Sequence, residues 1–119
     1  MKGPIISTQG GGNASLRLLP GPTLRISTAR LVELGFVPDA VVTVAAEPGA
    51  VTFTLREGGR ELVRFARANK MQLIQVQRHD RRILMEISGR LIEKAGLTEG
   101  DEITALCWRG LIQVRKLLS

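Results

Sequence analysis

Basic side chains gather in one stretch of this 119-residue chain, between positions 56 and 82. The stretch holds eight basic and three acidic residues, a net charge of +5 out of +6 for the whole chain. Because a guanidinium group donates paired hydrogen bonds to phosphate oxygens, an arginine cluster favours a nucleic acid as partner. The alternative is a solvated basic face that keeps the protein in solution. The candidate phosphate-binding residues are Arg60, Arg64, Arg67, Arg78, Arg81 and Arg82.

His79 is the single histidine of the chain and a weak candidate for catalysis. It lies beside Asp80 among arginines, in a segment that we expect to form a loop. Cleavage of RNA commonly uses two proton-transfer groups, and the chain has no second histidine and no tyrosine. Asp80 can orient the imidazole, although adjacent loop residues rarely hold that geometry. The alternative is a surface histidine in a polar turn, so the catalytic residues stay unknown.

Other reactive residue types do not converge on a site. Cys107 is the only cysteine, which excludes an intrachain disulfide and a cysteine-based metal cluster. Glu99, Asp101 and Glu102 are close in sequence, but alternation in a turn directs such side chains apart, and we expect no metal and no cofactor. Trp108 at a predicted hairpin tip is equally suited to stacking on a base and to packing on a strand or a partner chain.

Composition indicates one globular domain. The chain is 44% hydrophobic but has only three Phe and one Trp, so aliphatic side chains must fill the core. No apolar run approaches the ~20 residues that cross a bilayer, and the first residues lack the pattern of a secretory signal. We therefore expect a cytoplasmic protein with no membrane contact.

The chain repeats one order of elements with a shift of 61 residues. The shift places Ile26 on Ile87 and Gly35 on Gly96. Each copy reads as a short strand, a short helix closed by Gly and a large apolar residue, a polar step and a hairpin. One copy is too short to bury a core of its own. We therefore predict that two copies share one core in a pseudo-symmetric domain.

The predicted organisation has a lead, two repeats and a connecting helix. Residues 1–13 contain three consecutive glycines and are predicted to form a flexible N-terminal lead. Residues 14–119 form the single domain, with repeats at 14–57 and 70–119 joined by a helix at 58–69. The predicted strands are 14–19, 24–26, 41–46, 50–55, 71–77, 83–87, 103–107 and 111–115, and the short repeat helices end at Leu34 and Ala95, the second capped by Ser88.

The connecting helix at 58–69 is predicted to be amphipathic. Its apolar face, which includes Leu62, Phe65 and Ala66, is expected to dock on the strands. The opposite face then presents the arginines at positions 60, 64 and 67. The basic segment 77–82 is expected to lie near this helix.

The second copy resembles a known family. The matching features are Gly89, Leu91-Ile92, Ala95-Gly96-Leu97, Gly100-Asp101 and Gly110. They are similar to the core of SymE-like toxins, within the AbrB-like swapped-hairpin superfamily. The first copy keeps Leu34-Gly35-Phe36 but has Asp39-Ala40 in place of the Gly-Asp turn. Ile87-Ser88 stands where AbrB proteins have Ile-Pro, and Leu84 stands where SymE-like proteins carry an early arginine.

This resemblance implies both a fold and a function. The implied fold is α+β, with two β-α-β-β units that interleave their hairpins into a swapped-hairpin β-barrel. Such units normally come from the two chains of a homodimer, whereas here both lie in one chain. Two such chains can then pair as a homodimer of pseudo-dimers. The implied function is nucleic-acid binding in a toxin–antitoxin setting, with RNA ahead of DNA. Endoribonuclease activity is implied by resemblance only, without a catalytic set to transfer. The alternatives are an AbrB-like DNA-binding transcription regulator and a protein-interaction or inhibitor module.

Overall fold

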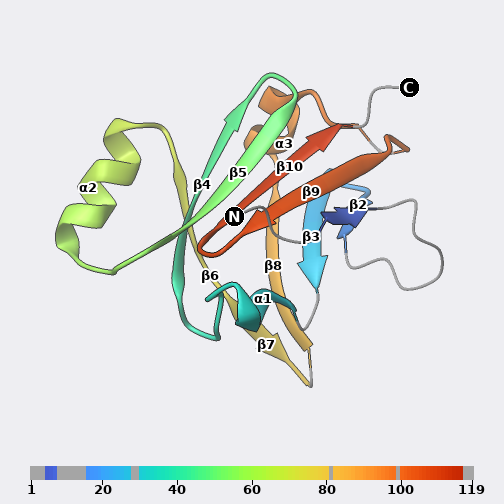
Figure 1. The fold of residues 1–119 in the computed structure, drawn as a ribbon. Helices are drawn as coiled ribbons and strands as arrows, with labels where there is room; N and C mark the ends of the chain where they lie inside the picture. Colours follow the sequence, from blue (N-terminus) through green and yellow to red (C-terminus); the bar gives the residue numbers. More distant parts are fainter. Residues whose placement is uncertain (1–4, 8–15, 28–29, 81, 99, 117–119) are drawn as a thin grey trace.

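The computed structural model describes residues 5–7, 16–27, 30–80, 82–98 and 100–116. These residues form an α+β fold with two antiparallel sheets and three helices (Figure 1). The elements in chain order are β1 (Ile5–Ser7), β2 (Leu16–Leu19), β3 (Thr23–Ser27), α1 (Arg30–Glu33), β4 (Val41–Glu47), β5 (Ala50–Arg56), α2 (Arg60–Ala68), β6 (Gln72–Gln75), β7 (Gln77–His79), β8 (Arg82–Ser88), α3 (Arg90–Ala95), β9 (Ile103–Trp108) and β10 (Leu111–Lys116).

The described strands form two open sheets, and the closed barrel predicted from the sequence is not present among them. The larger sheet has the order β1-β9-β10-β5-β4-β6, and the smaller has the order β2-β3-β8-β7. The predicted strand 71–77 is broken at Val76, whose N–H donates to the Ala40 carbonyl (2.9 Å) and whose carbonyl accepts from Asp39 N–H (2.9 Å). Because these bonds replace the ladder at that point, the chain leaves the larger sheet as β6 and joins the smaller one as β7.

The central strands of both sheets are related by the 61-residue shift. In the larger sheet Thr52 of β5 lies opposite Gln113 of β10, and in the smaller sheet Arg25 of β3 lies opposite Glu86 of β8. Each of these pairs joins two positions that are 61 apart, so a pseudo-twofold axis passes through both. The same shift takes the start of β2 to the start of β7. Strands β1 and β6 take equivalent places at the two edges of the larger sheet, but with an offset of 66 residues, since Ser7 lies opposite Thr104 and Leu73 lies opposite Thr43. The repeat therefore reaches back to β1, within the segment 1–13 for which a flexible lead was predicted.

The tip of each hairpin bonds to the helix of the other repeat. Gly49 N–H, at the β4–β5 turn, donates to the Ala95 carbonyl at the end of α3 (2.9 Å). Gly110 N–H, at the β9–β10 turn, donates to the Leu34 carbonyl after α1 (2.7 Å). The two bonds are equivalent under the shift, and Figure 1 shows α3 beside the β4–β5 tip.

The repeat helices end as the sequence predicts. Gly35 and Gly96 both adopt left-handed φ angles, 94° and 77°. The next residue, Phe36 or Leu97, folds back and donates its N–H to a helix carbonyl (2.8 and 3.2 Å), and both side chains are buried. A left-handed glycine followed by an apolar residue is the usual geometry of a helix C-terminus.

The start of α3 differs from the prediction. Ser88 was predicted to cap this helix, but Gly89 holds the N-cap position and no side chain caps the helix. The Gly89 carbonyl accepts from Ile92 N–H (3.1 Å) and Glu93 N–H (3.2 Å). Ser88 instead belongs to β8, where its backbone pairs with Thr23.

One core, drawn from both repeats, lies between the sheets. Phe36 and Phe53 are its largest side chains, and aliphatic residues fill the rest, as the composition predicts. Cys107 is buried within it. None of the helices in the described ranges has the length and apolar character needed to cross a bilayer.

Candidate nucleic-acid interface

Helix α2 carries the first group of predicted phosphate-binding residues. Arg60, Arg64 and Arg67 are all exposed. Their spacing of four and three residues places them along one side of the helix. Among the described residues, none of the three forms an ion pair with a carboxylate. These guanidinium groups are therefore open to an anionic partner.

The docking of α2 is narrower than the sequence predicts. Ala66 is only 2% exposed, Leu62 is half-buried, and the Ala66 carbonyl accepts from Met71 N–H (2.8 Å). Phe65 was predicted to dock with them, but its side chain is 42% exposed. Figure 1 shows α2 at one side of the molecule, and Ala66 is the one residue of the helix that is buried.

The exposed ring of Phe65 has a cationic neighbour from β5. The Arg56 guanidinium carbon lies 5.1 Å from the centre of the ring. Arg56 Nε also donates to Thr43 Oγ1 (3.0 Å), and Thr43 is buried in β4. The guanidinium group of Arg56 is therefore held between a fixed hydroxyl on the sheet and an aromatic ring on the helix.

The second group of predicted residues lies at the hairpin between β7 and β8. His79 pairs with Arg82 at the last position of the ladder, so His79 belongs to a strand and not to the predicted loop. Asp80 follows with a left-handed φ of 57°. Arg81 lies outside the described residues. His79, Arg78 and Arg82 are all exposed.

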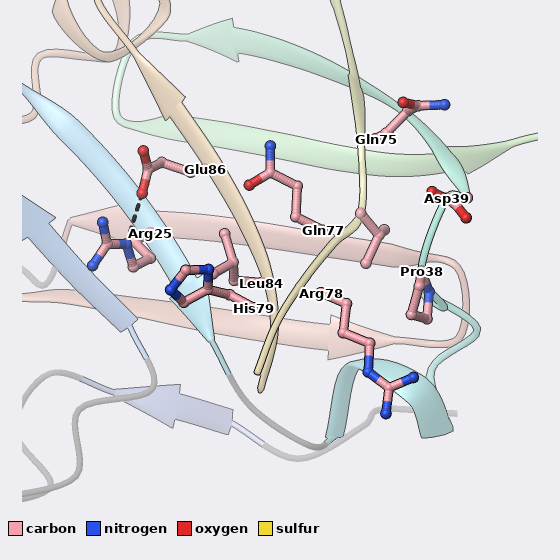
Figure 2. Close-up of a pocket in the computed structure, with 10 residues that line it drawn as sticks. Arg25, Pro38, Asp39, Gln75, Gln77, Arg78, His79, Leu84 and Glu86 are labelled. Atoms are coloured by element: carbon pink, nitrogen blue, oxygen red, sulfur yellow. Dashed lines mark hydrogen bonds and ion pairs between the residues drawn. The ribbon is translucent and has the colours of Figure 1, made fainter. Parts of the chain in front are cut away.

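A cleft of about 800 Å³ runs beside β7 (Figure 2). Arg25 and Glu86 form an ion pair at one side of it, with Nε and Oε2 2.6 Å apart. Figure 2 shows His79 extending toward this pair and Arg78 extending to the opposite side of β7. The lining residues are Arg25, Pro38, Asp39, Gln75, Val76, Gln77, Arg78, His79, Leu84 and Glu86.

The structure does not bring the two predicted groups together. The end of α2 and Arg78 are connected through the whole length of β6, at the edge of the larger sheet, and Arg78 belongs to β7 of the smaller sheet. Figure 1 shows α2 and β7 at different sides of the molecule. The expectation that segment 77–82 lies near α2 is therefore wrong. Arg78 is also separated from Arg82, because neighbouring strand residues face opposite ways and Arg82 shares the face of His79.

The cleft is lined both by His79 and by Glu86, a carboxylate that sequence reasoning missed. Glu86 lines the same cleft, but it is already bound by Arg25. The repeat contained part of the signal, because positions 25 and 86 are 61 apart, but the register of β3 on β8 decides which equivalent pair lies on the axis. No group of three potential metal-binding side chains occurs within the described part of the chain.

Comparison of the chain with family models, with curated proteins and with solved structures found no match. What the site does is therefore inferred from its charge and geometry.

Proposed function

We propose that this protein binds nucleic acid through the exposed arginines of α2, with RNA ahead of DNA. The observation that carries the proposal is the row formed by Arg60, Arg64 and Arg67, which no described carboxylate neutralises. The surrounding stretch, residues 56–70, holds five basic and two acidic residues. Arginine forks on an exposed helix match the spacing and charge of a phosphate backbone.

The order of RNA before DNA comes from the SymE-like resemblance alone. The same proposal includes a swapped-hairpin relation between the two repeats. It is supported by the reciprocal bonds in which Gly49 and Gly110 each donate to the helix end of the other repeat. Binding is the proposed activity, and an incubation of RNA with the protein, with and without chelator, tests separately for cleavage.

The deciding experiment removes the three charges from α2. The variant Arg60→Gln/Arg64→Gln/Arg67→Gln is compared with wild type by equilibrium binding to labelled RNA and to duplex DNA over a salt series. Each phosphate contact contributes about 0.7 to the slope of log affinity against log salt for a single strand. Loss of three contacts should lower that slope by about 2 and weaken binding at low salt.

A matched variant controls for net charge. Arg90→Gln/Arg109→Gln/Arg115→Gln also removes three exposed cations, from α3, the β9–β10 turn and β10. We expect this control to keep most of the affinity and slope of the wild type. If the two triple variants bind alike, the site is not on α2. Arg78→Gln/Arg82→Gln then measures whether the β7–β8 hairpin contributes.

A further inference from the structure

The strongest unexplained feature is the exposed ring of Phe65. The other two phenylalanines of the chain are fully buried in the core, whereas 42% of Phe65 is open on α2. Arg56 lies over the ring at 5.1 Å and is itself held by Thr43. The aromatic side chain is therefore placed and partly covered, yet it contributes little to the core.

A hollow of about 550 Å³ opens beside this ring. Its volume is within the range of roughly 300–1,000 Å³ that is typical of small-ligand sites. Both Arg56 and Arg60 line it, and Arg60 also belongs to the arginine row of α2. The full lining is Arg56, Glu57, Gly58, Gly59, Arg60, Glu61, Leu62 and Phe65.

The charged side chains that line the hollow indicate which part of a nucleotide it can bind. Glu57 and Glu61 line it as well, so a phosphate inside would face two carboxylates. Carboxylates instead accept hydrogen bonds from the exocyclic amino groups of bases. An aromatic ring supplies a stacking surface for a base, and the arginine row supplies the phosphate contacts outside.

We propose that α2 binds single-stranded nucleic acid, with one base stacked on Phe65 in this hollow and the adjoining phosphates on Arg60 and Arg64. The inference rests on the proposed function and narrows its partner to unpaired strands. In a duplex the neighbouring base pairs cover both faces of each base, so no base is free to stack on the ring. Bases that carry an exocyclic amino group, as in oligo-C, should bind more tightly than oligo-U.

The test replaces the ring while keeping the helix. Phe65→Leu removes the aromatic face and retains an apolar side chain with good helix propensity. Phe65→Trp retains an aromatic face. Val63→Leu is the matched control, because Val63 is similarly exposed on the same helix (46%). Each variant is checked for folding by circular dichroism and titrated with a labelled oligonucleotide, alone and annealed to its complement.

The expected result is a preference of the wild type for the single strand. Phe65→Leu should lose about ten-fold in single-strand affinity, the loss of one stacked base, with duplex affinity unchanged. Phe65→Trp and Val63→Leu should bind the single strand within about two-fold of the wild type. The inference is overturned if Phe65→Leu and wild type bind the single strand with equal affinity. That result is expected if Phe65 serves a protein partner instead.

The outcome also separates this inference from the proposed function. If the triple glutamine variant of α2 loses binding while Phe65→Leu does not, phosphate contacts exist and only the stacking is refuted. If neither variant changes the affinity, both the stacking and the α2 interface are refuted.

Discussion

The turn that leads from helix to hairpin occurs twice in this protein, around Asp39 in the first repeat and around Gly100 in the second. The backbones of the two turns agree. Both positions have a left-handed φ, 72° and 94°, and they are 61 residues apart. The equivalent bonds from Ala40 N–H to Val37 and from Asp101 N–H to Thr98 are both 3.0 Å long. The shape of the turn therefore survives a complete change of side chains.

Among the residues that the structure describes, the two turns are held by different partners. In the second repeat, Asp101 Oδ2 accepts from Thr98 N–H (2.8 Å) and Thr98 Oγ1 (3.0 Å), and Lys116 Nζ lies 3.4 Å away. The equivalent positions in the first repeat are Val37, Ala40 and Leu55, none of which can form such a network.

The first turn instead bonds to a neighbouring strand segment. The backbone of Val76, between β6 and β7, accepts from Asp39 and donates to Ala40. The comparison teaches that the backbone plan is common to both repeats, while the groups that hold it depend on what lies beside it. The candidate interface likewise depends on one place in the chain only. Helix α2, which carries it, lies between the two repeats and is not part of the backbone that they share.

The largest expected contrast between the repeats lies in the core. Phe53 and Val114 occupy equivalent positions and both are fully buried. Phe53→Ala should lower the free energy of unfolding by about 3–5 kcal/mol, because it leaves the larger cavity. Val114→Ala should cost about 2 kcal/mol. Urea unfolding monitored by circular dichroism measures the loss of stability in each variant. Equal losses would mean that the two side chains are not packed in equivalent ways.

Exchange of the turn residues should give a smaller and asymmetric effect. Gly100→Asp puts a side chain on a left-handed residue and should destabilise the protein by about 1 kcal/mol. Asp39→Gly relieves that strain but makes the unfolded chain more flexible, so its net effect should stay within about 0.5 kcal/mol of zero. Thermal unfolding of the two variants measures this difference. A larger loss from Asp39→Gly than from Gly100→Asp would show that the Asp39 side chain holds the turn.

The pair on the pseudo-twofold axis allows a charge-exchange test. Glu86→Arg would place two arginines opposite each other and should cost about 0.2–1 kcal/mol, since the pair is exposed. Arg25→Glu/Glu86→Arg restores opposite charges and should recover most of that loss. Unfolding of the single and double variants at low and high salt provides the interaction energy. A double variant no more stable than Glu86→Arg would mean that the ion pair contributes nothing.

The smallest expected effect is a pH dependence of the second turn alone. The pKa of Asp101 is held below its ordinary value of 3.8, chiefly by the hydrogen bond from Thr98 N–H, with the Thr98 hydroxyl and Lys116 adding to it and partial burial opposing it. A lowered pKa means that the carboxylate stabilises the fold fully above the ordinary value. That stabilisation is lost as the pH falls through the lowered, folded-state value.

Asp101→Asn tests this dependence. The variant should have a lower free energy of unfolding than the wild type. This difference should be constant near neutral pH and should become smaller below pH 3.8. Unfolding midpoints measured from neutral to acidic pH provide the comparison. A deficit that does not change with pH would show that the charge of Asp101 does not contribute.

Local features of this fold could be read from the residues. The shift of 61 predicted the two glycine-terminated helix ends and the hairpins at Pro48-Gly49 and Arg109-Gly110, because each depends on a few adjacent residues. The helix between the repeats was predicted at 58–69 and lies at Arg60–Ala68. The exposure of its arginines followed from helical periodicity.

Contacts between distant segments could not be read in the same way. Alternation in a strand indicates which side chains are buried, but it does not name the neighbouring strand. The break at Val76 and the pairing of β1 with β9 both depend on segments far apart in sequence. The same holds for the cleft that joins Arg25, His79 and Glu86 from three strands.

The amino-acid sequence by itself determined the duplicated backbone plan, the helix between the copies and the positive charge of that helix. Only the tertiary structure decided that the strands form two open sheets, that α2 and the β7–β8 hairpin lie apart, and that Phe65 stays exposed beside Arg56. The physical reason is the sequence distance over which each kind of interaction acts. Turn geometry and helical periodicity act over a few residues, whereas sheet order and the burial of a face depend on which distant surfaces meet.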